Sequence, residues 1–321
     1  MSNTFGERFR LTTFGESHGT AIGGIVDGCP AGIDFDETLV ADEMARRHIG
    51  DAATPRHEAD RVEILSGVFE GVTLGTPIAF VIANQDANSD EYSFMKELFR
   101  PGHADFTYEQ RYGVRDHRGG GRASGRETAA RVAGGAIAKM LLKKSGITMH
   151  TTVLTNQTPA NNDSVGGVVE CMVEGVKAGM GNPVFDKLGA RLAYAMMSIP
   201  SSIGFEMGEG FAAAEMTGSQ YRDNWVGNRN SGVPTAGNFS TITNHCGGIQ
   251  GGISNGMPLV FRTAFHPPVT IAQATDYIDR QGAIKTLTPD GRHDRCHVHR
   301  TAVVVEAMTA LVLADYLVIG D

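Results

Sequence analysis

The sequence predicts an α+β fold in one domain that spans residues 1–321 and has internal pseudo-symmetry. Segments with apolar residues at helical spacing alternate with short apolar runs bounded by glycine, which are typical of strands. A strand, a glycine turn and a helix also recur, because IGGIVDGCPAGIDFDETLVADEMA is similar to VGGVVECMVEGVKAGMGNPVFDKLGARLAYAM. No Pro/Ser-rich linker or charge run divides the chain, so we expect a duplicated βαβ-type unit within a single domain.

The first part of the chain predicts strands followed by a helix and a hairpin. Residues 9–19 and 21–33 read as apolar strands that run into glycine turns. Residues 35–48 predict a helix with acidic residues early and arginines at its end, as the helix dipole favours. Residues 62–84 predict a β-hairpin, because two apolar runs flank a glycine-containing segment.

Three further helices are predicted in the rest of the chain. One begins near Arg126 and ends with two lysines before Gly146, which can cap it. Residues 183–199 predict a second helix, and residues 301–318 are so uniformly apolar that they should form a core helix. Residues 151–162 are polar and rich in asparagine, which indicates a surface loop or a domain edge.

The composition restricts the possible functions. The net charge of −8 argues against general nucleic-acid binding, which needs a broad basic surface. The four cysteines form no CxxC or zinc-ligand spacing, so no metal site is predicted. With no signal peptide or membrane segment recognised, we expect a cytoplasmic protein that does not bind membranes.

Residues 100–135 concentrate positive charge in this acidic chain, with seven arginines and a glycine triplet before a predicted helix. Free backbone N–H groups at such a helix start favour an anion, and guanidinium groups add paired donors. The candidate donors in this segment are Arg115, Arg118, Arg122 and Arg126. We interpret the segment as an anion site, the alternative being a glycine hinge with solvated arginines.

Two histidines and an aspartate in turns are candidate catalytic groups. His18 in GESHG and His103 in RPGHAD could exchange protons with a ligand near neutral pH, or could simply stabilise their turns. Asp294 in DGRHDRC could accept a proton or form a structural ion pair. The glycine-rich residues 244–256 fit either a close cofactor approach or a set of tight turns.

Four motifs together resemble the chorismate synthase family. They are FGESHG, RPGHADFTYEQRYGVRDHRGGGRASGRETAARVAGGAIAKMLL, SNG after GGIQGGI, and GRHDRC followed by VVEAM. The resemblance extends from about residue 4 to the carboxyl end, with the motifs in family order. It implies a β-α-β sandwich fold and a homotetramer.

The resemblance also implies a reaction. Members of the family are lyases that convert 5-enolpyruvylshikimate 3-phosphate to chorismate and phosphate, a step of the shikimate pathway to aromatic amino acids. The anti 1,4-elimination needs reduced FMN although no net redox change occurs. NADPH is a candidate reductant for the flavin, although the sequence contains no nicotinamide-binding fingerprint.

The roles of individual residues follow from the same resemblance. His18 and His103 match the two active-site histidines, which donate protons toward the leaving phosphate and the flavin. Asp294 matches an aspartate near the flavin that assists loss of the substrate proton. Substrate binding is assigned to Arg47, Arg126 and His18. Cofactor binding is assigned to Arg122, Ala123, Ser124, Gly251, His266, Pro267, Pro268, Val269, Thr270 and Arg292.

The chain departs from the family pattern at several positions. Ala123 replaces a serine, Pro200 begins PSSIG in place of NAVKG, His266 replaces a lysine, Arg295 replaces a proline, and Asp51 lies where many members have another arginine. The region after Ile147 is shorter than usual by several tens of residues.

Each lost cation should weaken anion binding by about 1–3 kcal/mol, and His266 and Arg295 could compensate in part. We therefore expect an active enzyme. The alternatives are a flavin-binding homologue of low or altered activity and a non-catalytic anion-binding or assembly module.

Overall fold

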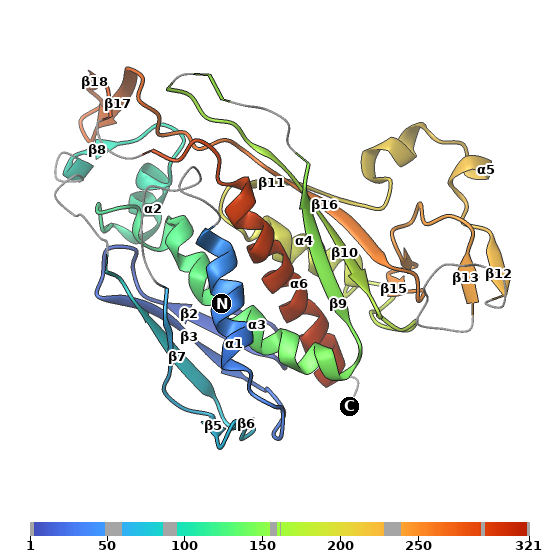
Figure 1. Ribbon diagram of the computed structural model, residues 1–321. Coiled ribbons are helices and arrows are strands. Elements are labelled where there is room, and N and C mark those ends of the chain that lie inside the picture. Colours follow the sequence, from blue (N-terminus) through green and yellow to red (C-terminus); the bar gives the residue numbers. More distant parts are fainter. Residues whose placement is uncertain are drawn as a thin grey trace.

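Two antiparallel sheets enclose a layer of helices in the computed structural model (Figure 1). The structure describes residues 3–48, 60–85, 95–154, 159–160, 162–227, 239–289 and 293–319. Helices α3 and α6 lie against each other, with α3 packed on the first sheet and α6 on the second. This arrangement confirms the predicted α+β sandwich.

The first sheet has the strand order β1-β2-β3-β7-β4. Its strands are β1 (Thr4–Phe5), β2 (Arg10–Phe14), β3 (Ala21–Asp27), β7 (Ile78–Ala83) and β4 (Val62–Ile64). The predicted hairpin is present, since β4 pairs antiparallel with β7. Its connection contains a second, smaller hairpin formed by β5 (Val68–Phe69) and β6 (Val72–Thr73).

The second sheet has the strand order β11-β16-β10-β9. Its strands are β11 (Ser202–Met207), β16 (Leu259–Phe265), β10 (Gly167–Glu174) and β9 (Thr148–Val153). Alternate residues of β10 and β16 are buried, with Cys171 opposite Phe261. Interpreting residues 151–162 as a loop was partly wrong, because residues 151–153 complete β9; residues 155–158 and 161 lie outside the described part.

The helix layer contains α1 (Glu37–Ala45), α3 (Thr128–Lys144), α4 (Leu188–Met197) and α6 (Val298–Ile319). Both sheets follow the repeated pattern, because β3 leads into α1 and β10 leads into α4. The helix predicted over residues 183–199 begins only at Leu188, since Lys187 has an extended backbone. The pseudo-symmetry expected from the sequence is therefore present at the level of elements.

The contact between α3 and α6 depends on a missing side chain. A Cβ atom added to Gly135 would lie only 2.4 Å from Cβ of Ala307 on α6. The neighbouring Gly134 makes a similar approach to Leu11 of β2. Glycine is therefore needed at position 135 for α3 to lie this close to α6, whereas a side chain at position 134 would require the end of Leu11 to shift.

A buried ionic network ties the helices together. Glu306 of α6 accepts hydrogen bonds from both Nη atoms of Arg46 at 2.6 Å, from Nζ of Lys139 at 2.7 Å and from Oγ1 of Thr151 at 2.8 Å. Burial alone would raise the pKa of Glu306, but the hydrogen bonds from Arg46 and the charge of Lys139 lower it to about 2. Lys139 also donates to Glu43 of α1 at 2.7 Å, so the network links α1, α3, β9 and α6.

Helix α6 is apolar along most of its length. Within the described residues, Val298–Val318 is the one segment long and apolar enough to cross a membrane, yet 89% of its most apolar window is buried inside the fold. It therefore serves as the core helix that its composition predicts.

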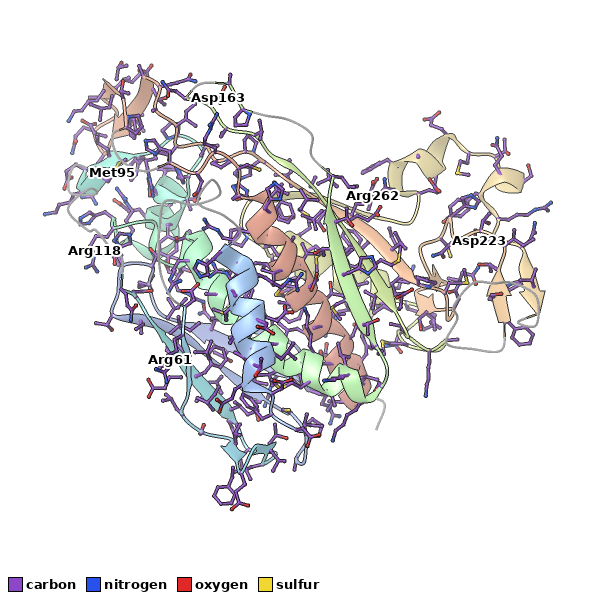
Figure 2. The ribbon with its side chains drawn as sticks, in the orientation of Figure 1. Arg61, Met95, Arg118, Asp163, Asp223 and Arg262 are labelled. Carbon is purple, nitrogen blue, oxygen red and sulfur yellow. The ribbon has the colours of Figure 1, made fainter. Side chains whose placement is uncertain are left out.

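Smaller elements extend from the sandwich on two sides (Figure 1). At the end where α3 and α6 begin lie α2 (Asp105–Tyr112), β8 (Leu98–Phe99), β17 (Thr275–Asp279) and β18 (Ile284–Leu287). An arm on the other side contains α5 (Gly218–Tyr221), β12 (Trp225–Gly227), β13 (Phe239–Thr241), β14 (Ile249–Gln250) and β15 (Ile253–Ser254). Figure 2 shows Met95 at the first end and Asp223 on the arm, on opposite sides of the molecule.

Candidate active site

A cavity of about 850 Å³ lies where α3 and α6 begin. Its volume falls within the range of about 300–1,000 Å³ typical of small-molecule sites. It brings together His18, His103 and Asp294, although these residues come from distant parts of the sequence. Other predicted site residues in its wall are Arg47, Arg126, Ala123, Ser124, His266, Pro268, Val269 and Thr270.

Three predicted residues of the described part do not appear in this wall. Arg122 donates to Oγ1 of Thr13 at 2.7 Å and to the carbonyl of Gly15 at 3.3 Å, so it stabilises the end of β2. Pro267 is adjacent to the lining residues, whereas Gly251 lies in the turn between β14 and β15. Arg292 lies outside the described residues. Cofactor contacts for Arg122, Pro267 and Gly251 thus find no support in the cavity geometry of this chain.

His18 is held by a turn that Asn84 fixes. Nδ2 of Asn84 donates to the carbonyls of Glu16 at 3.0 Å and Gly19 at 2.9 Å. Oδ1 of Asn84 accepts a hydrogen bond from Nε of Arg126 at 3.0 Å. One amide thereby sets the position of the His18 turn relative to a substrate-binding arginine. Our sequence reasoning missed this residue, whose only signal is an asparagine directly after an apolar strand.

The glycine triplet lets the chain pass against the ring of His18. Gly119, Gly120 and Gly121 have φ values of +59°, +87° and +54°, which favour glycine over other residues. A Cβ atom added to Gly119 would lie 2.3 Å from Cδ2 and Nε2 of His18. The triplet therefore positions backbone and imidazole together in one wall of the cavity.

A buried ion-pair cluster holds the turn that carries His103, between β8 and α2. Asp105, the first residue of α2, accepts from the backbone N, Nε and Nη2 of Arg100 at 3.0, 2.8 and 2.8 Å. Arg115 lies 3.4 Å from the same carboxylate and donates to the carbonyls of Met95 and Leu98 at 2.7 Å. These bonds leave the His103 turn little freedom to move.

His103 itself contacts the opposite wall. Its Nε2 lies 2.6 Å from Oγ1 of Thr270. Burial, followed by the charge of Arg100, lowers the pKa of His103 to about 4, against a smaller opposing effect of Asp105. His103 is therefore a neutral imidazole at pH 7 with these neighbours alone, and a nearby anion would raise its pKa.

The arginines of residues 100–135 have different surroundings. Arg115 and Arg126 both line the cavity, but the guanidinium of Arg115 also contacts protein carboxylates and carbonyls. Arg118 pairs with Asp116 and its side chain is 42% exposed. Arg118 and Arg122 are not among the lining residues. Most of the cationic donors predicted for a ligand therefore stabilise loops around it.

A buried carboxylate lies between the two arginines assigned to substrate. Asp60 accepts from Nη1 of Arg47 at 2.6 Å with one oxygen and from Nη1 of Arg126 with the other. Burial would raise the pKa of Asp60, but Arg47 and then Arg126 lower it. Nε of Arg47 is buried and has no hydrogen-bond partner among the described residues. Two guanidinium groups share one carboxylate, so the group retains a net positive charge for an anion.

Asp294 and the start of α6 close the cavity. Oδ1 of Asp294 lies 3.6 Å from Nη2 of Arg300, in the first turn of α6. Thr128, the first residue of α3, also lines the wall. Two helix amino ends therefore face one cavity, and their dipoles add to the positive charge of the arginines.

The substitutions noted in the sequence are distributed unevenly around this site. Ala123, Pro200 and His266 line the cavity. Arg295 instead donates to the carbonyl of Pro159 at 3.0 Å and is not part of the wall. The expected compensation by Arg295 therefore finds no support, whereas His266 stays in a position to provide it. Asp51 lies outside the described residues.

We expect stability to fall as the pH drops from about 6.5 toward 4. The pKa values of His103 and His297 are lowered from 6.5 to about 4, chiefly by burial, so the unfolded chain binds these protons first. Urea unfolding between pH 7 and pH 5, above the range in which the buried carboxylates titrate, should show the loss. His103→Gln should reduce this pH dependence, and an unchanged slope would contradict the lowered pKa.

These features define an enzyme active site for a small molecule that carries several negative charges. Imidazoles, a carboxylate, guanidinium groups and two helix amino ends surround one cavity. Comparison with known proteins identifies the family. The profile described as Chorismate synthase matches residues 9–159 and 154–318. The chain belongs to the chorismate synthase family.

Individual relatives agree with this assignment along nearly the whole chain. A chorismate synthase of Cytophaga hutchinsonii is 46% identical over 356 residues, with 98% of this chain and 97% of the relative covered. One of Nitratidesulfovibrio vulgaris is 49% identical over 351 residues, with 98% and 96% covered. Both alignments are longer than the 321 residues of this chain, so these relatives carry stretches that it lacks.

A solved structure described as a chorismate synthase crystal structure superimposes with a TM-score of 0.76 at 30% identity. It covers 98% of this chain and 93% of the other. The chain is thus an enzyme of the carbon-oxygen lyase class with a small-molecule substrate, as the resemblance predicted.

Proposed function

We propose that this enzyme catalyses the anti 1,4-elimination of phosphate from 5-enolpyruvylshikimate 3-phosphate with reduced FMN, giving chorismate. The observation that carries the proposal is the shared cavity, in which His18, His103 and Asp294 meet the Arg47–Asp60–Arg126 group. A substrate with one phosphate and two carboxylates requires such a cationic wall. The reaction is a step of the shikimate pathway, and its product supplies aromatic amino acid biosynthesis.

The residues around the cavity fit a phosphorylated flavin. Apolar surface from Pro268, Val269 and Pro200 can cover a flat ring, and Ser124 and Thr270 offer hydroxyl groups. The buried Nε of Arg47 is a donor that a ligand oxygen would satisfy. Reduced flavin, when bound, supplies an electron that is returned before the reaction ends.

Substrate binding falls to the arginines. Arg47 and Arg126 are fixed by Asp60, so their remaining N–H groups are oriented before any ligand arrives. This preorganisation reduces the ordering cost of binding a phosphate or carboxylate. Positive charge fixed in this way also stabilises the negative charge that develops on a leaving phosphate.

The histidines and the aspartate move the protons. The reaction breaks the C–O bond to phosphate and one C–H bond of the ring, and forms one C=C bond. We assign His18 and His103 as donors toward the leaving phosphate and the flavin, and Asp294 as the group that assists loss of the ring proton. The anionic substrate favours protonation of His103 by raising its lowered pKa, so that binding itself charges the acid.

The turnover assay tests this function directly. Purified protein is mixed anaerobically with FMN, a chemical reductant and the enolpyruvyl phosphate substrate, and chorismate absorbance and released phosphate are measured. Production of both in equal amounts is expected. Tight flavin binding without turnover would favour the low-activity homologue, and neither binding nor turnover would favour the non-catalytic module. Relatives 44–49% identical that carry the enzyme's name argue for activity.

The proposal also covers the assembly, the location and the electron source of the enzyme. We expect a homotetramer in the cytoplasm, with NADPH as a candidate source of electrons for the flavin. Light scattering measures the assembly. Replacing the chemical reductant by NADPH in the turnover assay tests whether the chain reduces its own flavin.

Gly119→Ala should impair catalysis through His18. The added methyl group would contact the imidazole at 2.3 Å and displace it, so we expect kcat to fall at least about tenfold. Gly113→Ala is the matched control, since Gly113 also has a positive φ of +74° but nothing within 4 Å of an added Cβ. Both variants carry the backbone strain, so equal kcat values for the two would contradict the contact argument.

A further inference from the structure

His297 contributes an unused hydrogen-bonding atom to the wall of the cavity. Its Nε2 is buried and has no hydrogen-bond partner among the described residues. Buried polar atoms in proteins are nearly always paired, so an exception in a ligand cavity indicates a partner supplied by the ligand. Neither the sequence motifs nor the assigned catalytic roles include this residue.

The backbone of His297 caps the amino end of α6. Its carbonyl accepts hydrogen bonds from the backbone N atoms of Arg300 and Thr301, both at 3.1 Å. The residue therefore precedes the first turn of a helix of 22 residues. The positive end of the helix dipole therefore favours an anion beside this residue.

Neighbouring groups favour an anion at the same place. The rings of His266 and His297 meet edge to face, with centroids 6.3 Å apart. Nδ1 of His266 lies 2.7 Å from the carbonyl of Pro267 and must donate to it, because a carbonyl only accepts. This leaves Nε2 of His266 as its second ring atom for a ligand. Arg300 adds its charge from the first turn of α6, balanced in part by Asp294, whose Oδ1 lies 3.6 Å from Nη2 of Arg300.

We propose that Nε2–H of His297 donates a hydrogen bond to a phosphate group bound at the start of α6, beside His266 and Arg300. The proposal rests on the proposed function only for the identity of the phosphate, which belongs to the flavin or to the substrate. His297 is thus a further binding residue, distinct from the catalytic histidines.

The protonation state of His297 suits this role. Burial, then the charges of His266 and Arg300, lower its pKa to about 4. At neutral pH the ring is therefore an uncharged donor that needs no counterion. A phosphate would reverse the effect of His266 and Arg300 and raise the pKa, so binding should take up a proton below about pH 6.5.

Calorimetric titration of the full-length protein with inorganic phosphate at pH 7 tests the proposal without an activity readout. We expect His297→Leu to weaken phosphate binding about tenfold, the scale of one hydrogen bond to a charged group. His297→Gln should recover most of the affinity, because its amide N occupies a position like that of Nε2. The control is His299→Leu, which changes an exposed neighbour in the first turn of α6.

Two further arms identify the source of the phosphate. If the flavin supplies it, His297→Leu weakens FMN binding but leaves riboflavin binding unchanged. If the substrate supplies it, the variant weakens binding of shikimate 3-phosphate but not of shikimate. Unchanged affinity for inorganic phosphate, FMN and shikimate 3-phosphate overturns the proposal. Failure of the turnover assay alone would instead reject the proposed function and leave these binding results standing.

Proton uptake gives a second readout if the leucine variant folds poorly. Phosphate titrations at pH 6 in buffers of different ionisation enthalpy measure the protons bound with the ligand. His297→Gln should bind phosphate with a smaller uptake than the unaltered protein. Equal uptake in both proteins would contradict a direct contact between phosphate and His297.

Discussion

His103→Ala is expected to lower kcat for chorismate formation by about 10²–10⁴-fold, the usual contribution of a positioned acid. The turn that carries His103 is locked by the Arg100–Asp105 pair, and its ring faces Thr270 across the cavity. Stopped-flow measurement of chorismate absorbance at saturating substrate gives kcat separately from binding.

The pH profile separates proton donation from simple positioning. If substrate raises the pKa of His103, kcat should fall as the pH rises through that new value, and His103→Gln should lose this limb. The control is His150→Ala, which removes an exposed imidazole from β9. A His103→Ala enzyme with less than a tenfold loss in kcat would remove His103 from the chemistry.

Asp60→Asn is expected to destabilise the protein by about 3–5 kcal/mol, the cost of leaving a buried charge uncompensated. The side chain keeps its size but loses the charge that balances Arg47 and Arg126. Urea unfolding at pH 7 measures the change. Asp27→Asn is the control, because its pair with Arg10 is largely exposed and should contribute less than about 1 kcal/mol.

Added phosphate should restore part of the stability of Asp60→Asn. An anion that binds only the folded state stabilises it by mass action, and the variant has more unbalanced positive charge to attract it. The increase in unfolding free energy with phosphate should therefore be larger in the variant than in the unaltered protein. A loss below about 1 kcal/mol, with no response to phosphate, would show that Asp60 does not organise the two arginines.

Periodicity predicted the helices and strands because it depends on neighbouring residues. The apolar run of α6 and the paired lysines that end α3 could be placed from local sequence alone. The start of α4 was placed too early, because the backbone of Lys187 is extended rather than helical. The fold class could therefore be predicted from the sequence more accurately than the residues at which the elements begin and end.

Only those site residues that lie in a recognisable motif could be predicted from the sequence. His18, His103 and Asp294 were candidates from their turn motifs, received their roles from the family resemblance, and do share a cavity. Asp60 and Asn84 were missed, because their partner Arg126 is 66 and 42 residues away and nothing local marks the contact. The sequence also cannot distinguish an arginine that holds a ligand from one that holds a carboxylate.

The close contact between Gly135 of α3 and Ala307 of α6 also affects the size of the cavity. Both helices begin at the cavity, so a change in their spacing at Gly135 would also shift their amino ends. A methyl group at position 135 would push the two helices apart. The displacement would reach the amino end of α3, about two helical turns away, where the cavity lies. The dimensions of the cavity therefore depend in part on Gly135, which is not one of its lining residues.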